Sequence, residues 1–150
     1  MQLTQTIVAA LFAASSVVAA PAPSEKSMMT TGVPQWTIEG VKRVCDGADN
    51  QCNWTFKINP KIYSKTPVNF VTKRSGATPA SQNNGVAQNF GDYTITSGWS
   101  GQFGPGNGFT TLAVVDNKNR RITWPAYTDK QVAGGKVVSP DQSYAPQNLP

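Results

Sequence analysis

The sequence predicts an all-β domain, and three observations lead to this prediction. Short segments in which apolar and polar residues alternate recur along the chain, a pattern typical of half-buried strands. No window of eleven residues has a helical period. Gly, Pro, Asn and Thr are frequent between the segments, as expected of turns. We expect a single-domain antiparallel β-barrel built from hairpins, with a β-sandwich as the alternative and at most a short helical turn, at 60–65.

The clearest hairpin is predicted at 36–59. Apolar residues alternate with polar ones through its second half, and a phase slip at Gly40 indicates a bulge in its first half. Turn-forming Asp-Gly and Asp-Asn lie between Cys45 and Cys52. A hairpin would place these two cysteines opposite each other, within the separation that a disulfide accepts. We therefore predict a Cys45–Cys52 disulfide that closes the hairpin.

The remaining strands are predicted at 68–74, 90–99, 110–115, 120–127 and 136–138. A polar loop is expected at 75–87, a glycine-rich loop at 98–108 and a turn at 116–119. In the strand at 120–127, Ile122, Trp124 and Ala126 form the apolar side. Pro125 indicates that this strand is at an edge or ends there.

The chain divides into four parts. Residues 1–20 are predicted to be a signal peptide, because an uncharged apolar run is followed by small residues. An extended arm is expected at 21–34, the β-barrel domain at 35–139 and an irregular, proline-containing tail at 140–150. The apolar run is too short for stable membrane insertion. The sequence therefore predicts a secreted, extracellular protein, which also suits a disulfide.

Composition narrows the classes of function. Thirteen basic and eight acidic residues give a net charge of +5, and the basic residues are dispersed. This charge suits a soluble basic surface, or attraction to acidic cell-wall polymers, anionic membranes or nucleic acid. No nucleic-acid-binding motif is present, so we expect no nucleic-acid partner. The absence of histidine excludes Ser-His-Asp and Cys-His catalysis and removes most zinc and copper sites.

Paired carboxylates are the remaining route to catalysis. Glu39 with Asp92 or Asp129 could form a glycosidase pair, but nothing in their spacing favours it. The cysteines are assigned to the disulfide, so we predict no metal, no cofactor and no enzyme activity. Asn53-Trp54-Thr55 is an N-glycosylation sequon, which makes Asn53 a candidate for modification.

Two clusters are candidates for binding a partner. Three aromatic residues border the glycine-rich loop, where they would either stack on a partner or fill the core: Trp99, Phe103 and Phe109. Three basic residues lie at the tip of the following hairpin, where they would steer an acidic partner or simply be solvated: Lys118, Arg120 and Arg121.

The hairpin WTIEGVKRVC…CNWTFKIN, the short signal and the single cysteine pair resemble small secreted fungal hypersensitive-response-inducing protein elicitors, such as those of the rice blast fungus. The resemblance implies a β-barrel that a fungal pathogen secretes, and we expect it to be a monomer. It also implies that plants sense the protein through a cell-surface or apoplastic component and respond with defence and local cell death. No catalytic residues come with it. The other readings are a carbohydrate- or cell-wall-binding module, a protease inhibitor presenting a loop, and a weak carboxylate hydrolase.

Overall fold

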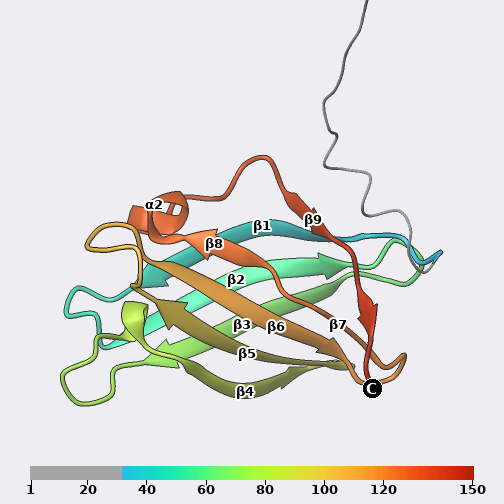
Figure 1. Ribbon diagram of the computed structural model, residues 1–150, viewed down its shortest axis with the longest axis horizontal. Coiled ribbons are helices and arrows are strands. Elements are labelled where there is room, and N and C mark those ends of the chain that lie inside the picture. Colours follow the sequence, from blue (N-terminus) through green and yellow to red (C-terminus); the bar gives the residue numbers. More distant parts are fainter. Residues whose placement is uncertain (1–31) are drawn as a thin grey trace, which may run out of the picture. The chain divides into compact units, whose positions relative to one another are not determined.

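The computed structural model describes residues 32–150, which Figure 1 shows coloured along the sequence. The predicted signal peptide at 1–20 lies outside the described residues, as does most of the arm predicted at 21–34. Within 33–150 the regular elements are mainly antiparallel strands, so the all-β prediction is confirmed.

The first sheet has four strands in the order β3-β2-β1-β9. These are β1 (Trp36–Cys45), β2 (Gln51–Asn59), β3 (Thr66–Lys73) and β9 (Gln142–Tyr144). The predicted hairpin is confirmed: β1 and β2 pair antiparallel with Cys45 opposite Cys52, and the two sulfurs are bonded. The predicted bulge is also present, since the register shifts between Glu39 and Lys42, around Gly40 with φ of 64°.

The second sheet has the order β10-β7-β6-β5-β4, with β8 also paired to β6. Its strands are β4 (Gly85–Phe90), β5 (Tyr93–Ser100), β6 (Phe109–Asp116), β7 (Arg121–Thr123), β8 (Ala126–Thr128) and β10 (Gln147–Asn148). β7 and β8 pair with the same side of β6, one after the other, because the predicted strand at 120–127 is interrupted at Trp124-Pro125. The interruption agrees with the expectation based on Pro125.

The two sheets pack face to face and enclose the core. Alternate residues of β1, β2, β3, β5 and β6 point inward, and the fully buried ones include Ile38, Trp54, Phe70, Ile95 and Leu112. The sheets are not closed into the barrel that the sequence led us to expect; the sandwich alternative describes the architecture. At one edge, β3 and β4 are linked by a side chain in place of a strand ladder. The Val71 N–H donates to Gln88 Oε1 at 3.0 Å, and Gln88 Nε2 donates to the Val71 carbonyl at 2.7 Å.

The C-terminal tail joins the sheets at the other edge. β9 pairs with β1 and β10 pairs with β7, so the tail predicted to be irregular instead contributes a short strand to each sheet. Its sequence has no apolar alternation, and these strands depend on the free edges that β1 and β7 offer. The strand predicted at 136–138 does not form; Val138 is buried, and its N–H donates to the Val41 carbonyl at 2.8 Å.

The polar loop predicted at 75–87 is shorter than expected, because β4 already begins at Gly85. The sequence did not predict the start of β4, because this strand has polar residues and Gly85 is its only buried position. A Cβ on Gly85 would lie 2.3 Å from the ring of Phe70, so glycine is needed for this close approach. A 3-10 turn, η1 (Ala80–Gln82), precedes the strand.

The helical turn expected at 60–65 does not form, and Lys61 there has φ of 74°. Helical structure occurs instead in η1, in α2 (Asp129–Val132) and in the 3-10 turn η2 (Ala133–Gly135). A capping box fixes the start of α2: the Thr128 side chain accepts from the Gln131 N–H, and the Gln131 side chain accepts from the Thr128 N–H. No helix in the described residues is long and apolar enough to cross a membrane.

The apolar side predicted for 120–127 faces outward. Thr123, Pro125 and Tyr127 are buried, whereas Trp124 is 46% exposed and Ala126 is exposed. Both sides of this segment carry apolar residues, so alternation defined the two sides without deciding which one is buried. The buried side is the one that carries Tyr127, because its ring packs against Trp54 and Tyr144 in the core.

Candidate functional site

The glycine-rich stretch forms a folded connection between β5 and β6, which we call the glycine loop (residues 101–108). Two successive turns build it. The Gly104 N–H donates to the Gly101 carbonyl at 3.0 Å, and the Asn107 N–H donates to the Gly104 carbonyl at 3.1 Å. Gly104 and Gly106 have φ of 95° and 78°, which residues with a side chain rarely adopt. The backbone of the loop is therefore held in one conformation by its own hydrogen bonds.

Trp99, at the end of β5, anchors the glycine loop. Its indole Nε1 donates to Asp129 Oδ2 at 2.9 Å. A Cβ on Gly101 or on Gly108 would lie 2.5 Å from a carbon of the indole ring, so these glycines allow the loop to close over it. Trp99 is consequently only partly exposed, and it positions the loop more than it offers ring area to a partner.

Asp129 is the centre of a polar network beneath the loop. Its Oδ1 accepts from Arg43 Nη1 at 2.9 Å, and the Arg43 side chain is only 9% exposed. The Arg43 guanidinium also lies 5.6 Å from the centre of the Trp54 ring, a cation–π contact. The Asp129 N–H donates to the Gly108 carbonyl at 2.9 Å. Asp129 thus ties the glycine loop to β1 and to the core.

A second carboxylate, Asp49, fixes the neighbouring turn. Its Oδ1 accepts from the Ser81 N–H at 2.9 Å, and its Oδ2 accepts from the Ser81 hydroxyl. The Ser81 carbonyl in turn accepts from Arg43 Nη1 at 3.4 Å. The turn at 46–50, η1, α2 and the glycine loop therefore form one connected end of the sandwich, which we call the loop end.

Phe103 is the exposed aromatic residue of the glycine loop. Its side chain is 65% exposed, and its ring stacks on that of Phe109 with centres 5.8 Å apart and an angle of 28° between the planes. The Phe103 carbonyl accepts from Asn107 Nδ2 at 3.3 Å, which restrains the backbone beside it. The structure thus brings Phe103 and Phe109 together and places apolar area in solvent on an ordered loop.

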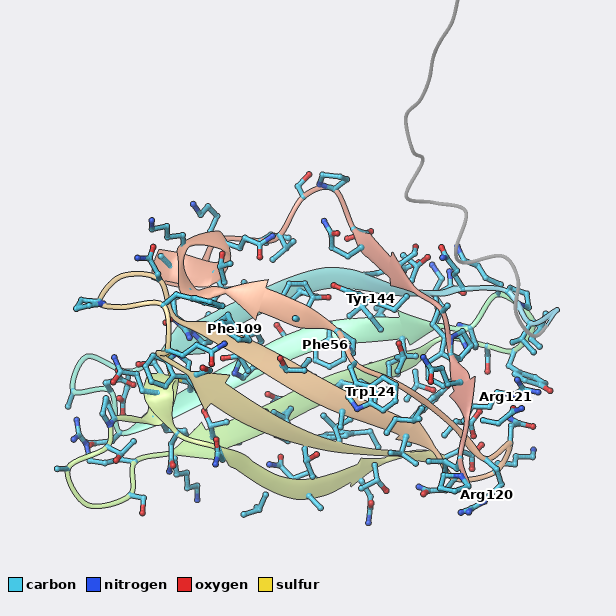
Figure 2. The ribbon with its side chains drawn as sticks, viewed as in Figure 1. Phe56, Phe109, Arg120, Arg121, Trp124 and Tyr144 are labelled. Carbon is cyan, nitrogen blue, oxygen red and sulfur yellow. A yellow bond between two sulfur atoms is a disulfide. The ribbon has the colours of Figure 1, made fainter. Side chains whose placement is uncertain are left out.

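The predicted basic cluster lies far from these aromatic residues. Lys118 and Arg120 belong to the turn after β6, and Arg121 begins β7. β6 separates the two clusters, and its eight residues span roughly 23 Å. Figure 2 shows Phe109 and Arg120 toward opposite ends of the sandwich. The candidate partner-binding residues therefore form two regions.

Within the basic cluster the two arginines are restrained differently. Arg120 Nη2 donates to the Pro150 carbonyl at 3.2 Å, so it holds the end of the tail. Arg121 Nη1 is buried and has no hydrogen-bond partner in the described part of the chain. Lys118 is exposed. Arg120 and Lys118 are thus the members of the cluster with charge at the surface.

Asn53 lies on the outer side of β2 in a row of amides. Its Nδ2 donates to Asn69 Oδ1 at 3.0 Å, and its Oδ1 accepts from Gln51 Nε2 at 3.1 Å. Glycosylation of Asn53 would attach a sugar to Nδ2, the atom that donates to Asn69. The modification stays a prediction.

The carboxylates considered for catalysis lie in different places, and those of Glu39 and Asp129 are held by their own partners. Glu39 pairs with Lys65 at 2.9 Å and accepts from Asn59 Nδ2 at 2.8 Å; the hydrogen bonds from Lys65 and Asn59 hold the pKa of Glu39 below its usual value. Asp129 is held by Arg43 and Trp99. Asp92 lies beside the turn after β6, where its carbonyl accepts from the Asn117 N–H at 2.9 Å.

Cys45, Asp49 and Cys52 form the one group of three potential metal ligands in close proximity within residues 32–150. The two sulfurs are bonded to each other, so neither is available as a thiolate. With the disulfide formed, Asp49 is the one member of this group that could still bind a metal. A metal site needs about four ligands, and the Asp49 carboxylate already accepts hydrogen bonds from Ser81.

Sequence reasoning missed the residues that hold the loop end together, chiefly Arg43, Asp49 and Ser81. Arg43 falls on the inward side of β1, where an apolar residue is expected. One local signal was present: Thr128 followed three residues later by Gln131 is a capping box, and it marks the helix that begins with Asp129. The partners of that aspartate come from distant segments and have no such signal.

The comparisons with known proteins agree with each other. A family model described as Effector TSP1 matches residues 37–149, which include β1 to β10 apart from the first residue of β1. The curated protein named Effector TSP1 from Hypocrea virens is 55% identical over 150 residues, covering 100% of both chains.

Proposed function

Because the chain belongs to the Effector TSP1 family, we propose that it is a secreted fungal effector that plants sense, with defence and hypersensitive cell death as the response. In this proposal the protein acts by binding an apoplastic or plant cell-surface component, not by catalysis. The resemblance to elicitors such as those of the rice blast fungus supports the same response. The Cys45–Cys52 disulfide is consistent with an extracellular protein.

The observation that carries the proposal is an exposed aromatic ring, Phe103, on an anchored loop, stacked on the partly buried Phe109. Binding hot spots are enriched in aromatic residues. A loop that must be ordered on binding costs free energy, which weakens the affinity. The stacked Phe103 and Phe109 rings are presented by a backbone that the Trp99–Asp129 hydrogen bond and two turns already hold. Much of that ordering has therefore occurred on folding.

The carboxylates support binding over hydrolysis. A glycosidase needs one carboxyl group with a raised pKa to act as the acid, close to a second carboxylate. The pKa of Glu39 is lowered by Lys65 and Asn59, which keeps it ionised. Both carboxylate oxygens of Asp129 already accept hydrogen bonds, one from Arg43 and one from Trp99.

Leaf infiltration with purified folded protein tests the proposal, with heat-denatured protein as the baseline. Phe103→Ala should abolish cell death while leaving the melting temperature unchanged within about 1 °C, because its side chain is largely in solvent. Gln102→Ala, an exposed neighbour in the same loop, is the matched control and should remain active. Full activity of folded Phe103→Ala would contradict binding through this loop.

The proposal that the protein acts without catalysis has its own test. Glu39→Gln and Asp92→Asn, made singly, should retain the plant response. Loss of the response in either variant, with its fold intact by circular dichroism, would favour the hydrolase instead. Trp99→Ala is a poor probe, because removing the indole also removes the anchor of the loop.

A further inference from the structure

The outer side of the second sheet carries an exposed tryptophan. Trp124 lies between β7 and β8, with its side chain 46% exposed. Figure 2 shows it in front of the strands near the middle of the sheet. The neighbouring outward positions on β6 and β8 are small, namely Ala113, Thr111 and Ala126. Small neighbours leave the indole accessible from solvent.

This side of the sheet is uncharged. On β5 and β6 the outward residues alternate with the buried ones, and β8 continues the row; none of these outward residues is Asp, Glu, Lys or Arg. The outer side of the first sheet differs, since it has Glu39, Lys42 and Lys57 at outward positions of β1 and β2. In a chain of net charge +5, an uncharged face of this extent is a specific feature.

Two hydroxyl groups on the same outward side of the sheet are available for a ligand. Thr96 is paired with Ala113, and Thr111 is paired with Gly98 on one strand and with Ala126 on another. Within the described residues, neither threonine hydroxyl has a hydrogen-bond partner. Neighbouring strands are about 4.8 Å apart and alternate residues about 6.7 Å apart, so these groups make a flat surface.

We propose that this surface, which we call the Trp124 face (Trp124, Ala113, Thr111, Thr96, Ala126 and Ile122), binds a neutral polysaccharide. A sugar ring presents apolar C–H groups on its faces and hydroxyl groups around its rim. The C–H groups suit the indole, and the rim hydroxyls can donate to and accept from the threonines. The residues of this surface differ from those proposed for the glycine loop, and the two regions adjoin at Phe109, which heads the outward row of β6.

Charge decides between the occupants of the Trp124 face. An anionic membrane or an acidic polymer binds through clustered Lys and Arg, and this face has none. The basic residues of the chain lie elsewhere, including Lys118 and Arg120 in the turn beyond the end of β6. A neutral chain of sugars needs no charged residue, and a flat surface can follow several of its rings.

Sedimentation with insoluble polysaccharides tests the proposal on the full folded chain. The probes are cellulose, chitin and a β-1,3-glucan, and cross-linked, insoluble polygalacturonate serves as the acidic comparison. At least one neutral probe should retain the protein at a salt concentration on the order of 0.5 M, which screens surface charges. Trp124→Ala should weaken this retention at least tenfold. Phe103→Ala, which removes an exposed aromatic residue elsewhere, should bind like the original protein.

A second variant protects the test against misfolding. Thr111→Lys places a charge on the Trp124 face and should also weaken retention, whereas Thr55→Lys on the outer side of β2 should not. Retention unchanged in both Trp124→Ala and Thr111→Lys would overturn the proposal. So would failure of every neutral probe, binding to polygalacturonate alone, or self-association that Trp124→Ala abolishes without any retention. Loss of the plant response in Phe103→Ala with retention intact would separate this site from the proposed function.

Discussion

The two ends of the sandwich differ in how deeply their charged contacts are buried, since the Arg43 side chain is 9% exposed at one end and the Lys65 side chain is 52% exposed at the other. At the loop end, Asp129 bonds Arg43 and Trp99 across 86 and 30 residues of sequence, and Asp49 bonds Ser81 across 32. At the opposite end, which we call the turn end (residues 60–65, 91–92 and 117–120), Asp116 bonds the N–H groups of its own turn, two and three residues away. The long-range side-chain bonds from Lys65 to Glu39 and from Arg120 to Pro150 there come from exposed cations.

The comparison shows where stability and recognition are combined. The long-range bonds of the loop end order a surface loop without burying it, so Phe103 can be exposed and still be held by its backbone. At the turn end Lys118 and Arg120 are exposed cations, and Arg120 also holds the end of the tail through the Pro150 carbonyl. We therefore expect substitutions at the loop end to change stability most.

Asp129→Ala should have the largest effect. It leaves the Arg43 guanidinium buried and unpaired, which costs about 3 kcal/mol or more of the free energy of unfolding. The matched control is Glu39→Ala at the turn end, whose partner Lys65 is 52% exposed; loss of that solvent-screened pair should cost far less stability. Urea denaturation measures both. Equal losses in the two variants would mean that the ends do not differ as proposed.

Removal of the disulfide comes next. Cys45 and Cys52 are seven residues apart and cross-link the turn at the loop end. Closing so short a loop should stabilise the fold by about 2–3 kcal/mol, so the Cys45→Ser/Cys52→Ser double variant should lose that amount and still fold. Thiol titration of the unfolded, unreduced protein should find no free thiol. Two thiols per chain would show that the bond does not form in solution.

Alkaline pH should weaken the turn end. Burial, together with Asp116 and Asp92, raises the pKa of Tyr93 to about 12, from 10 in the unfolded chain. The folded state therefore holds the phenol proton more tightly, so this contribution is complete below pH 10 and is lost as pH rises through 10 toward 12. By pH 11 the loss should be about 1.4 kcal/mol.

Tyr93→Phe isolates this effect, because it removes the titrating group and keeps the ring that packs against Trp36. The stability difference between the original protein and Tyr93→Phe should shrink by that amount between pH 9 and pH 11. A difference that stays constant over this range would show that Tyr93 titrates alike in both states.

The sequence predicted local features and missed distant ones for one physical reason. The hairpin at 36–59, its bulge at Gly40 and the turn after β6 depend on residues close together in the chain, and each was found. The face of 121–128, the pairing of the tail and the partners of Asp129 depend on which distant segment packs against them. Alternation could not decide whether Trp124 or Tyr127 is buried, since both sides of that segment are apolar.

The candidate site divides in the same way. Aromatic residues around the glycine loop could be named from the sequence, because glycine and Phe are conspicuous locally. Their roles could not: Trp99 anchors the loop through a hydrogen bond to Asp129, while Phe103 is exposed. The inward position of Arg43 on a strand made sense only once Asp129 was seen opposite it.

The smallest expected effect concerns Arg120 at the turn end. It has φ of 56°, a left-handed angle that glycine adopts without steric cost. Arg120→Gly should relieve that cost, which is about 1 kcal/mol, but it also removes the hydrogen bond from Nη2 to the exposed Pro150 carbonyl and frees the backbone of the unfolded chain. The net change should be a gain of about 0.5 kcal/mol in the free energy of unfolding, measured as a higher urea midpoint with the same slope. Lys118→Gly is the control: it lies in the same turn without a positive φ and should lose stability. If Arg120→Gly also loses stability, the bond to Pro150 holds the tail more firmly than the left-handed backbone strains the turn. An exposed side-chain contact at the turn end would then contribute more stability than its exposure suggests, and the contrast between the two ends would narrow.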